Sequence, residues 1–299
     1  MNNTPSLEDL RLFSVVSRKA SFAASALELG MSKAFVSKRI AVLEKSLGVT
    51  LLHRTTRSVS LTENGQVVLQ WAQRILEDVD GMTDAVSHTR QSVRGLLRLC
   101  SSSGFGRNHL APALSTLARQ YPELEIQLEL LDRRVDLAGE GFHLDIRLGQ
   151  VQEPDMIARR IARNARILCA SPAYLKAAGM PATLQDLSQH RCIVIRERDQ
   201  DFGRWRLKGP NGIESVKVSG PLSANNGEIV HQWARDGHGI ILRSRWDVEP
   251  SIARGDLMHI LPQYEQEADV WAVYPSRLTT SAKVSACVQF LEQWLARRN

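Results

Sequence analysis

SFAASALELGMSKAFVSKRIAVLEKSLG, residues 21–48, is the stretch that decides the fold of the N-terminal part of this chain. Ser21 and Ser32 each stand where a helix needs a side-chain acceptor at its N-cap. Gly30 follows the first helical segment, where a helix end favours a residue in the left-handed conformation. The second segment carries apolar residues at helical spacing from Val36 to Leu47. Two short helices joined by a tight glycine turn predict a helix-turn-helix.

The flanking residues add a further helix and a wing. A helical pattern behind Ser6, another N-cap, precedes the helix-turn-helix. Residues 51–54 and 59–61 indicate two short strands around a polar turn that contains Arg57. Arg54 and Arg57 would lie where a DNA backbone passes a β-hairpin wing, and such phosphate contacts position a protein without specifying sequence.

The polar face of the second helix carries residues suited to the major groove. Lys and Arg can reach guanine edges or phosphates, Ser can donate or accept, and a small apolar side chain can touch a thymine methyl group. The alternative is a solvated face on an ordinary helical hairpin. The candidate DNA-binding residues are Ser32, Lys33, Ala34, Ser37, Lys38 and Arg39 on the helix, with Arg54 and Arg57 on the wing.

Positive charge is concentrated in this N-terminal part. The chain has 299 residues and a formal net charge of +6, and residues 1–60 contain nine Lys or Arg against four Asp or Glu. A basic module is the electrostatic footprint of nucleic-acid binding.

The length predicts about two domains. A composition of 43% hydrophobic and 23% charged residues argues against a disordered or fibrous chain.

Residues from Thr62 to about Gln91 predict a long linker helix. Its apolar positions follow a heptad seam, which favours dimerisation through this helix. The stripe could instead pack onto its own domain. The seam consists of Val68, Ala72, Ile75, Val79, Met82 and Val86. We therefore expect a DNA-binding domain at 1–65, a linker and dimerisation helix at 66–91, and a second large domain at 92–299, to which the family resemblance given below assigns a regulatory role.

Residues 92–299 alternate strand and helix signals, which indicates α/β layers with mixed sheets. Helices are expected near 110–117, 172–178, 228–236 and 282–295. Strands are expected at 96–100, 124–130, 144–148, 166–170, 191–195, 216–218, 239–242, 257–260 and 270–273.

The motifs together resemble a known family. SFAASA (21–26), MSKAFVSKRI (31–40) and LLHRTTR (51–57), closed by LTENG (61–65), are similar in order and spacing to the winged helix-turn-helix of LysR-type transcriptional regulators. Lys33 and Ala34 stand where the family often has Gln and Pro or Ser, so we expect a shifted operator sequence. The resemblance extends to the family's effector domain, two α/β lobes that resemble a periplasmic solute-binding protein, with the second lobe at about 167–265.

The resemblance implies a fold and a function. The expected fold is an N-terminal winged helix-turn-helix, mainly α, with a long linker helix and a C-terminal α/β two-lobed effector domain. The expected function is sequence-specific regulation of transcription, as activator or repressor, under the control of a small anionic effector. The implied partners are a double-stranded DNA operator, a small carboxylate, further copies of the chain in a dimer or tetramer, and RNA polymerase. No cofactor is expected.

Two loops that open helices are candidate effector-binding segments. Residues 101–107 combine hydroxyls, glycines and a cation between a strand end and a helix N-terminus, where free N–H groups favour an anion. An ordinary Ser-capped turn is the alternative. The family resemblance implies that a second loop faces the same cleft from the other lobe, so that two helix N-termini suit a dicarboxylate. The candidates are Ser101, Ser102, Ser103, Phe105 and Arg107 in the first loop, and Asn225 and Asn226 in the second.

Arg147 and Arg196 complete the candidate ligand site. Either could clamp a carboxylate with two hydrogen bonds, or be a surface arginine paired with Glu197 or Asp199. Within the family, segments 101–112, 196–199, 227–230 and 239–244 look like regulators of tartrate and D-malate metabolism. This implies a C4 hydroxydicarboxylate effector such as D-malate or tartrate, with a different small acid or thiol oxidation as the alternative.

The sequence argues against several other functions. It contains no HExxH, GxSxG, P-loop or GxGxxG motif, so we expect no enzyme and no catalytic residue. His231 and His238 are expected on a helix surface. A ligand-independent DNA-binding protein would have no use for a 200-residue sensor-like domain. A plain solute-binding protein would lack residues 1–65.

Cysteine usage and hydropathy indicate an intracellular protein. Cys100, Cys169, Cys192 and Cys287 form neither a CxxC pair nor a zinc-ligand spacing, so we expect core cysteines and no metal site. No apolar run approaches the ~20 residues of a membrane span. The N-terminal residues do not follow the pattern of an export signal. The expectation is a cytoplasmic protein with no membrane partner.

Overall fold

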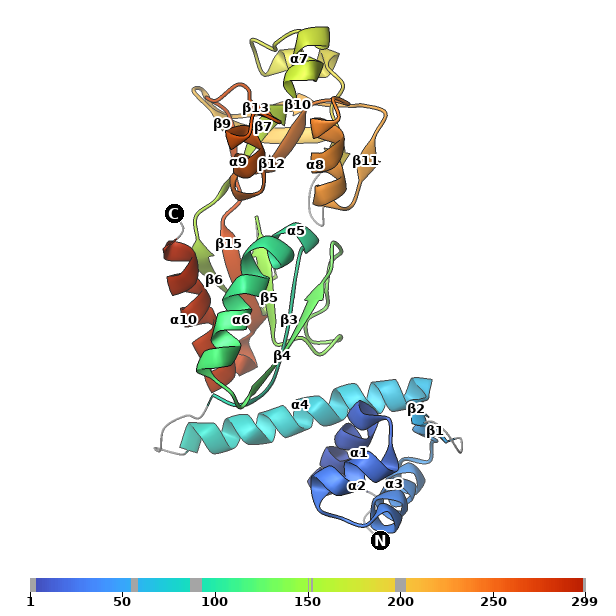
Figure 1. The fold of residues 1–299 in the computed structure, drawn as a ribbon. Helices are drawn as coiled ribbons and strands as arrows, with labels where there is room; N and C mark the ends of the chain where they lie inside the picture. Colours follow the sequence, from blue (N-terminus) through green and yellow to red (C-terminus); the bar gives the residue numbers. More distant parts are fainter. Residues whose placement is uncertain are drawn as a thin grey trace. The chain divides into compact units, whose positions relative to one another are not determined.

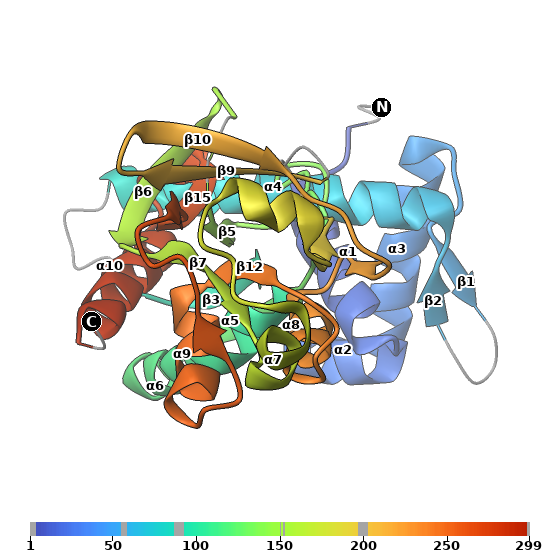
Figure 2. The same cartoon turned by 90° about the horizontal axis from the view of Figure 1, so that it is seen from above.

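The computed structural model describes residues 4–54, 59–86, 93–149, 151, 153–196 and 203–297. The chain forms two compact units (Figures 1 and 2). One unit comprises residues 1–91 together with the short turn 139–141, and the other comprises 92–138 and 142–299.

The N-terminal unit is a helical cluster with a wing and a long helix, as the sequence predicts. Ser6, Ser21 and Ser32 accept hydrogen bonds from the backbone N–H groups of Asp9, Ala24 and Phe35, so each expected N-cap is present. Gly30 ends the second helix at a φ of +65°. The elements are α1 (Leu7–Lys19), α2 (Phe22–Leu29), α3 (Lys33–Leu47), β1 (Leu52–Arg54), β2 (Val59–Leu61) and α4 (Glu63–Val86).

The core of this unit collects the apolar faces of its helices. Phe13 of α1, Ile40 of α3 and Ala72 of α4 are all inaccessible to solvent within one cluster. The pairing of β1 with β2 is antiparallel, with Leu52 opposite Leu61. The wing therefore closes onto the same core that carries α3.

The apolar stripe of α4 differs from the predicted seam. Val68 and Ala72 pack against the core of their own unit, which was the alternative for this helix. Among the α4 side chains that the structure describes, the large apolar ones that remain exposed are Val67, Trp71, Ile75 and Met82. The expected seam is therefore wrong at Val68 and Ala72, because a helix that covers α1 must turn those residues inward. Residues 87–91 of the expected helix lie outside the described residues.

The second unit consists of two lobes, each built on one sheet. In lobe I the strand order is β4-β3-β5-β15-β6, with β3 parallel to both β4 and β5 and with β15 antiparallel to its neighbours. Helices α6 and α10 cover one face of this sheet (Figure 1), where Leu97, Leu117 and Leu291 are buried together. The strands are β3 (Gly95–Ser101), β4 (Leu124–Leu130), β5 (Leu144–Leu148), β6 (Met156–Ala162) and β15 (Val270–Pro275). The helices are α5 (Ser103–Phe105), a π-helical turn (Gly106–Leu110), α6 (Ala111–Gln120), a 3₁₀ turn (Ser276–Leu278) and α10 (Ala282–Ala296).

Lobe II is built on an antiparallel sheet of order β10-β9-β14-β7-β12, with β13 also paired to β7. Strands β8 and β11 form a separate, short parallel sheet. The strands are β7 (Ala165–Ala170), β8 (Val194–Ile195), β9 (Arg204–Gly209), β10 (Gly212–Lys217), β11 (Ser223–Ala224), β12 (Ile241–Ser244), β13 (Met258–His259) and β14 (Glu265–Glu267). The helices are α7 (Pro172–Ala178), a 3₁₀ turn (Gln185–Gln189), α8 (Gly227–Arg235) and α9 (Arg245–Ala253).

Two chain crossings connect the lobes, one between β6 and β7 and the other between β14 and β15 (Figure 1). They are hydrogen-bonded to each other. The N–H of Asn164 donates to Oδ1 of Asp269 at 3.0 Å, and its Nδ2 donates to the carbonyl of Ala268 at 2.9 Å. In return, the N–H of Ala268 donates to the carbonyl of Asn164 at 3.0 Å. The crossings therefore form one clasp between the lobes.

The predicted fold class is confirmed, but some elements are not where the sequence analysis placed them. It did not predict β6, β9, β11, β14 or α9. The strand expected at 191–195 is regular only at Val194–Ile195, and the strand expected at 216–218 is the end of the longer β10. The unpredicted β9 contributes most to the site described next.

Candidate functional site

The polar face of α3 exposes several of the residues predicted to bind DNA. Ser32, Lys33, Ala34 and Lys38 are exposed, and Ser37 is half-buried. They lie opposite the buried face formed by Val36, Ile40 and Leu43. The helix therefore presents two cations, a hydroxyl and a small methyl group near its N-terminal end.

Arg39, by contrast, is held by contacts within its own unit. Its guanidinium lies 2.7 Å from the carboxylate of Asp9, which is 9% exposed, and donates to the hydroxyl of Ser6 at 3.2 Å. Both partners belong to the start of α1. Since a half-buried ion pair fixes the side chain, the structure gives Arg39 the role of holding α3 against α1.

Arg54 is also held by its own unit. It lies 2.6 Å from Glu44 of α3 and 5.2 Å above the centre of the Phe22 ring. Glu44 also accepts the N–H group of Leu51 at 2.8 Å and thereby joins α3 to the wing. The guanidinium of Arg54 is thus pre-positioned at the base of the wing, one-third exposed. Arg57 lies outside the described residues.

A cleft of about 670 Å³ lies between the two lobes and is strongly basic. Both lobes line it, lobe I with residues from α5 and β5, and lobe II with residues from β7, β9 and β12. Among the described residues, its acids are Asp132, Asp247 and Glu267. Its cations are Arg147, Arg166, Arg204, Arg206, Lys208 and Arg243.

Strand β9 supplies three of these cations by simple alternation. Trp205 and Leu207 are buried in the core of lobe II. Because successive side chains of a strand point to opposite faces, Arg204, Arg206 and Lys208 share the other face, and all three line the cleft. One strand therefore presents a row of positive charge to the cleft.

Arg147 reaches the cleft from the centre of lobe I, as its position after a strand core predicts. It is only 7% exposed, and its guanidinium donates to Asp145 at 3.0 Å and to Glu153 at 2.7 Å. Burial works to lower the pKa of Arg147, but the hydrogen bond to Glu153 and the two carboxylate charges outweigh burial and raise it. The carboxylates of Asp145 and Glu153 thus fix Arg147 in its charged state. Arg166, a cation of the cleft that comes from β7, donates to Gln266 at 2.7 Å.

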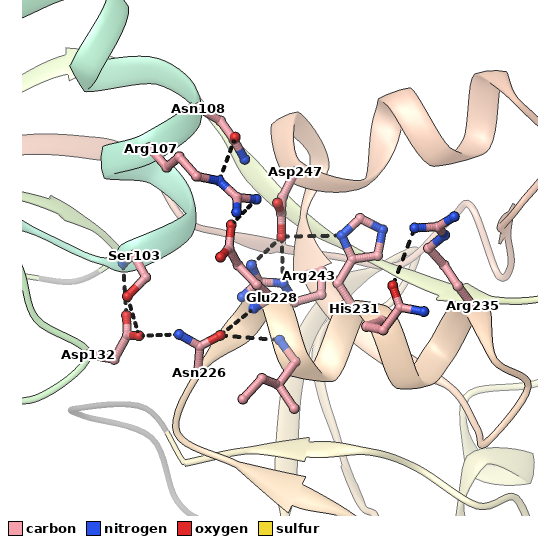
Figure 3. Close-up of polar contacts among 12 residues, drawn as sticks. Ser103, Arg107, Asn108, Asp132, Asn226, Glu228, His231, Arg235, Arg243 and Asp247 are labelled. Atoms are coloured by element: carbon pink, nitrogen blue, oxygen red, sulfur yellow. Dashed lines mark hydrogen bonds and ion pairs between the residues drawn. The ribbon is translucent and has the colours of Figure 1, made fainter.

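The first predicted anion loop is occupied by a carboxylate of the protein itself. The N–H group of Ser103 donates to Oδ1 of Asp132 at 3.0 Å, and its hydroxyl donates to Oδ2 at 2.7 Å (Figure 3). Ser101 is fully buried, and its hydroxyl donates to the carbonyl of Ile146. The expectation that Ser101 and Ser103 face a ligand is therefore corrected: Ser101 joins β3 to β5, and Ser103 holds Asp132.

Two polar contacts connect the lobes beside this loop (Figure 3). Asn226 caps α8 through its Oδ1 and donates from Nδ2 to Asp132 at 2.8 Å. Arg107 pairs with Glu228 of α8 at 2.5 Å. Arg107 is not among the residues that line the basic cleft, and its ion pair with Glu228 joins the two lobes.

Arg243 and Asp247 form the floor of the same region. Nε of Arg243 donates to Asp247 at 2.9 Å, and the guanidinium packs over Gly227. A Cβ at Gly227 would lie 2.0 Å from Nη1 of Arg243, so a larger residue there would displace the guanidinium. His231 is 4.0 Å from Asp247 and 3.0 Å from the Ser251 hydroxyl, at 16% exposure. It is a half-buried residue, not the surface histidine that we expected, whereas His238 is exposed as expected.

The remaining predicted ligand residues have different positions. Ser102, Phe105 and Asn225 line the cleft. Phe105 is buried and stacks on Trp246 at 5.9 Å between ring centres. Arg196 is exposed, follows β8 and does not line the cleft. Its candidate partners Glu197 and Asp199 lie outside the described residues.

Both units match descriptions of one protein family. Residues 7–66 match "Bacterial regulatory helix-turn-helix protein, lysR family". Residues 90–296 match "LysR substrate binding domain". The chain belongs to the LysR family. The two matches coincide with the α3-bearing unit and with the lobes that form the basic cleft.

Curated relatives support this membership over the whole chain. A LysR-family relative from Escherichia coli (strain K12), "HTH-type transcriptional regulator DmlR", is 57% identical over 99% of this chain and 96% of its own length. A second from the same strain, "HTH-type transcriptional activator TtdR", is 45% identical over 100% of this chain and 96% of its own length. Both are named regulators of transcription, which confirms the expectation that this LysR protein is not an enzyme.

Solved LysR structures share the architecture. CrgA from Neisseria meningitidis aligns with a TM-score of 0.60 and 28% identity, covering 97% of this chain and 98% of that chain. The full-length Vibrio cholerae virulence activator AphB aligns with a TM-score of 0.57 and 26% identity, covering 96% and 98%. This LysR protein thus shares both of its units with full-length regulators.

The chemistry of the cysteines and acids adds two findings about this LysR chain. All four cysteines are buried, and burial raises the pKa of Cys169, Cys192 and Cys287 to about 12. Such thiols stay protonated and react slowly. In the described ranges there is no cluster of His, Cys, Asp and Glu suited to a metal ion and no helix that could span a membrane.

Sequence reasoning missed most of the cleft's charge. Arg166, Arg204, Arg206, Lys208 and Arg243 were not predicted as site residues, and neither was Asp132. The alternation RWRLKG at 204–209 was a signal for a strand with a cationic face. Nothing local to Asp132 or Arg243 indicates that they meet in one cleft.

Proposed function

We propose that this LysR-type regulator binds an operator as a dimer and changes its DNA affinity when a C4 hydroxydicarboxylate, such as D-malate or tartrate, occupies the interlobe cleft. The observation that carries the effector proposal is the charge of the cleft. Among the described residues that line the cleft, cations outnumber acids: the cations are Arg147, Arg166, Arg204, Arg206, Lys208 and Arg243, and the acids are Asp132, Asp247 and Glu267.

The distribution of these cations supports a ligand with two acidic groups. Arg147 lies in lobe I, whereas the cations of β7 and β9 lie in lobe II. A guanidinium binds a carboxylate with two parallel hydrogen bonds. A dicarboxylate can therefore engage both lobes at once. The resemblance of segments 101–112, 227–230 and 239–244 to regulators of tartrate and D-malate metabolism supports a hydroxylated C4 acid.

For DNA, the proposal rests on α3 and the wing. Lys33, Ser37 and Lys38, with the methyl group of Ala34 and the hydroxyl of Ser32, are proposed to read base edges. Arg54, held by Glu44, is proposed to contact a phosphate. The exposed stripe Val67, Trp71, Ile75 and Met82 on α4 supports a dimer. Two copies of α3 would then read a partly symmetric operator. A bacterial regulator of this kind acts in the cytoplasm, where the chromosome is.

Thermal unfolding of the full chain tests the effector proposal. The panel contains D-malate, L-malate, the tartrates, succinate, benzoate and buffer. A ligand at about 100 times its Kd should stabilise the folded chain by roughly 2.7 kcal/mol, a visible rise in Tm. Arg206→Ala should remove the shift, while Arg196→Ala, outside the cleft, should retain it. The absence of a shift with every C4 acid would refute the effector class and leave the DNA-binding function standing.

A further inference from the structure

Asp132 is an acidic residue in a cleft whose described charged residues are mostly cations. It follows β4 in lobe I and lines the cleft with Ser102 and Asn225. A carboxylate beside the binding place of an anion raises the free energy of the bound anion through like-charge repulsion. A carboxylate at this place lowers the affinity of the cleft for an anion unless it also binds another group of the ligand. The contacts of Asp132 indicate which kind of group it can bind.

The contacts of Asp132 leave its charge unbalanced. In the part of the chain that the structure describes, its partners are the N–H and hydroxyl of Ser103 and the amide Nδ2 of Asn226, at 2.7–3.0 Å. All three are neutral donors. An ionised carboxylate has about four acceptor positions, so these bonds hold the group in place and leave one position for a further donor.

The two other acids among the described residues of the cleft differ from Asp132 in their contacts and exposure. Asp247 accepts from the guanidinium of Arg243, which neutralises it. Glu267 is exposed on β14, where water solvates it. Asp132 is half-buried and held rigidly by both lobes, so it is the acid placed to select a donor on a ligand.

We propose that Asp132 determines specificity by accepting a hydrogen bond from the hydroxyl group of a hydroxydicarboxylate. This inference rests on the proposed effector class of the cleft. The carboxylates of the ligand meet the cations of β5, β7 and β9, and its hydroxyl meets Asp132. A dicarboxylate without the hydroxyl meets the same repulsion and gains no hydrogen bond in return, so it binds more weakly. Sites that bind a hydroxyl through a held polar group reject the analogue that lacks it.

The same residue links ligand recognition to the contact between lobes. Asp132 belongs to lobe I, and Asn226, which donates to it, caps α8 of lobe II. A hydroxyl bound at Asp132 therefore adds a fourth donor to a group that already joins the lobes. Succinate would fill the basic part of the cleft without contributing to this junction.

Calorimetric titration of the full chain with malate and succinate tests the proposal. For the wild type we expect the better malate enantiomer to bind at least about tenfold more tightly than succinate, the effect of one hydrogen bond to a charged acceptor. Asp132→Asn keeps the size of the side chain and removes its charge. We expect succinate to bind more tightly to this variant and the malate-to-succinate ratio to fall to about one.

Two further variants make the result specific. Glu228→Gln removes one negative charge from the neighbouring interlobe ion pair with Arg107 but lies outside the basic cleft. It should therefore leave the ratio unchanged. Asp132→Ser removes the same charge as Asp132→Asn with a smaller side chain, so it repeats the test if the first variant unfolds, which circular dichroism would show.

The outcomes separate this inference from the effector proposal. Equal binding of malate and succinate by the wild type, or an unchanged ratio in the Asp132 variants, would overturn the role of Asp132 while the cleft remains a dicarboxylate site. Tight binding of L-aspartate that is lost in Asp132→Asn would replace the hydroxyl by an ammonium group and refute the hydroxyl assignment. Binding of none of these acids would refute both proposals.

Discussion

Lys38 and Arg39 are neighbours in sequence, yet their charges have different surroundings. Lys38 is exposed on the polar face of α3, whereas Arg39 is paired with the buried carboxylate of Asp9. A helical wheel places both near the groove-facing side, because it contains no information about α1. The position of a residue on its own helix therefore does not decide whether its charge is available to DNA, because an acid on a neighbouring helix can pair with it.

Lys38→Ala and Arg39→Ala should consequently fail in different ways. We expect Lys38→Ala to retain the wild-type Tm and to lose about 1–3 kcal/mol of operator preference over random DNA. Arg39→Ala should lower the Tm, since it leaves Asp9 buried without its partner. Competition binding assays and thermal unfolding measure the two effects. An unchanged Tm in Arg39→Ala would contradict the structural role given to this ion pair.

His231 provides a residue-scale prediction on pH. Burial lowers its pKa below the usual 6.5, although the carboxylate of Asp247 offsets part of this effect. The unfolded chain therefore binds a proton at this residue at a higher pH than the folded chain does. The free energy of unfolding should decrease as the pH falls below about 6.5.

His231→Gln should show a smaller loss of Tm than the wild type between pH 7.5 and 5.5. Some loss will remain, because burial also lowers the pKa of His259. His238→Gln is the matched control, because this histidine is exposed just beyond α8. If both variants lose stability as steeply as the wild type, the buried state of His231 is not what limits stability in acid.

At the scale of elements, sequence periodicity located the helices of the N-terminal unit and most strands of the lobes. Serine caps and a glycine at positive φ are local signals, so α1 to α3 could be predicted from a few residues each. Strand β9 was missed because Arg204, Arg206 and Lys208 hide a short alternation behind high polarity. The cations that line the cleft could not be predicted as a group for a related reason: they meet only when β5, β7 and β9 are assembled.

Helix α4 shows the same limit. Its heptad pattern predicted one apolar seam, but an amphipathic helix can bury part of its stripe on its own unit and leave the rest exposed. The structure turns Val68 and Ala72 inward and leaves Ile75 and Met82 of the predicted seam exposed, together with Val67 and Trp71. The dimer contact should therefore be sought on these four exposed residues.

We expect Ile75→Glu to weaken the dimer at least about tenfold, because a charge must be desolvated in an apolar contact. Analytical ultracentrifugation measures the dimer Kd, and operator affinity should fall with it. Gln66→Glu introduces the same charge on the same helix at another exposed position and should have little effect. A dimer that tolerates Ile75→Glu would show that the copies meet elsewhere.

At the scale of the whole molecule, the proposed control of DNA binding is a coupling between two sites. An effector alters operator affinity only if it binds the DNA-bound and free forms with different affinity, and the coupling must be the same in both directions. This property does not depend on the structural route between the cleft and α3.

The affinity for the effector should therefore change when the operator is present. We expect a change of about 5- to 150-fold, the usual range of coupling between sites. Calorimetric titration of the effector into the chain with and without operator DNA measures the ratio. The same ratio must appear when DNA is titrated with and without effector. Equal effector affinities in both titrations would exclude control of DNA binding by this ligand.

The clasp between the lobes, in which Asn164 and Asp269 tie the two crossings together, limits what any ligand can communicate. These hydrogen bonds resist sliding of one lobe past the other, so we expect the lobes to move mainly by opening and closing about the clasp. Chemically different ligands should then differ mainly in the degree of opening that each one stabilises. Full agonists, partial agonists and antagonists should consequently fall on a single graded scale of lobe opening, whatever their chemical structures.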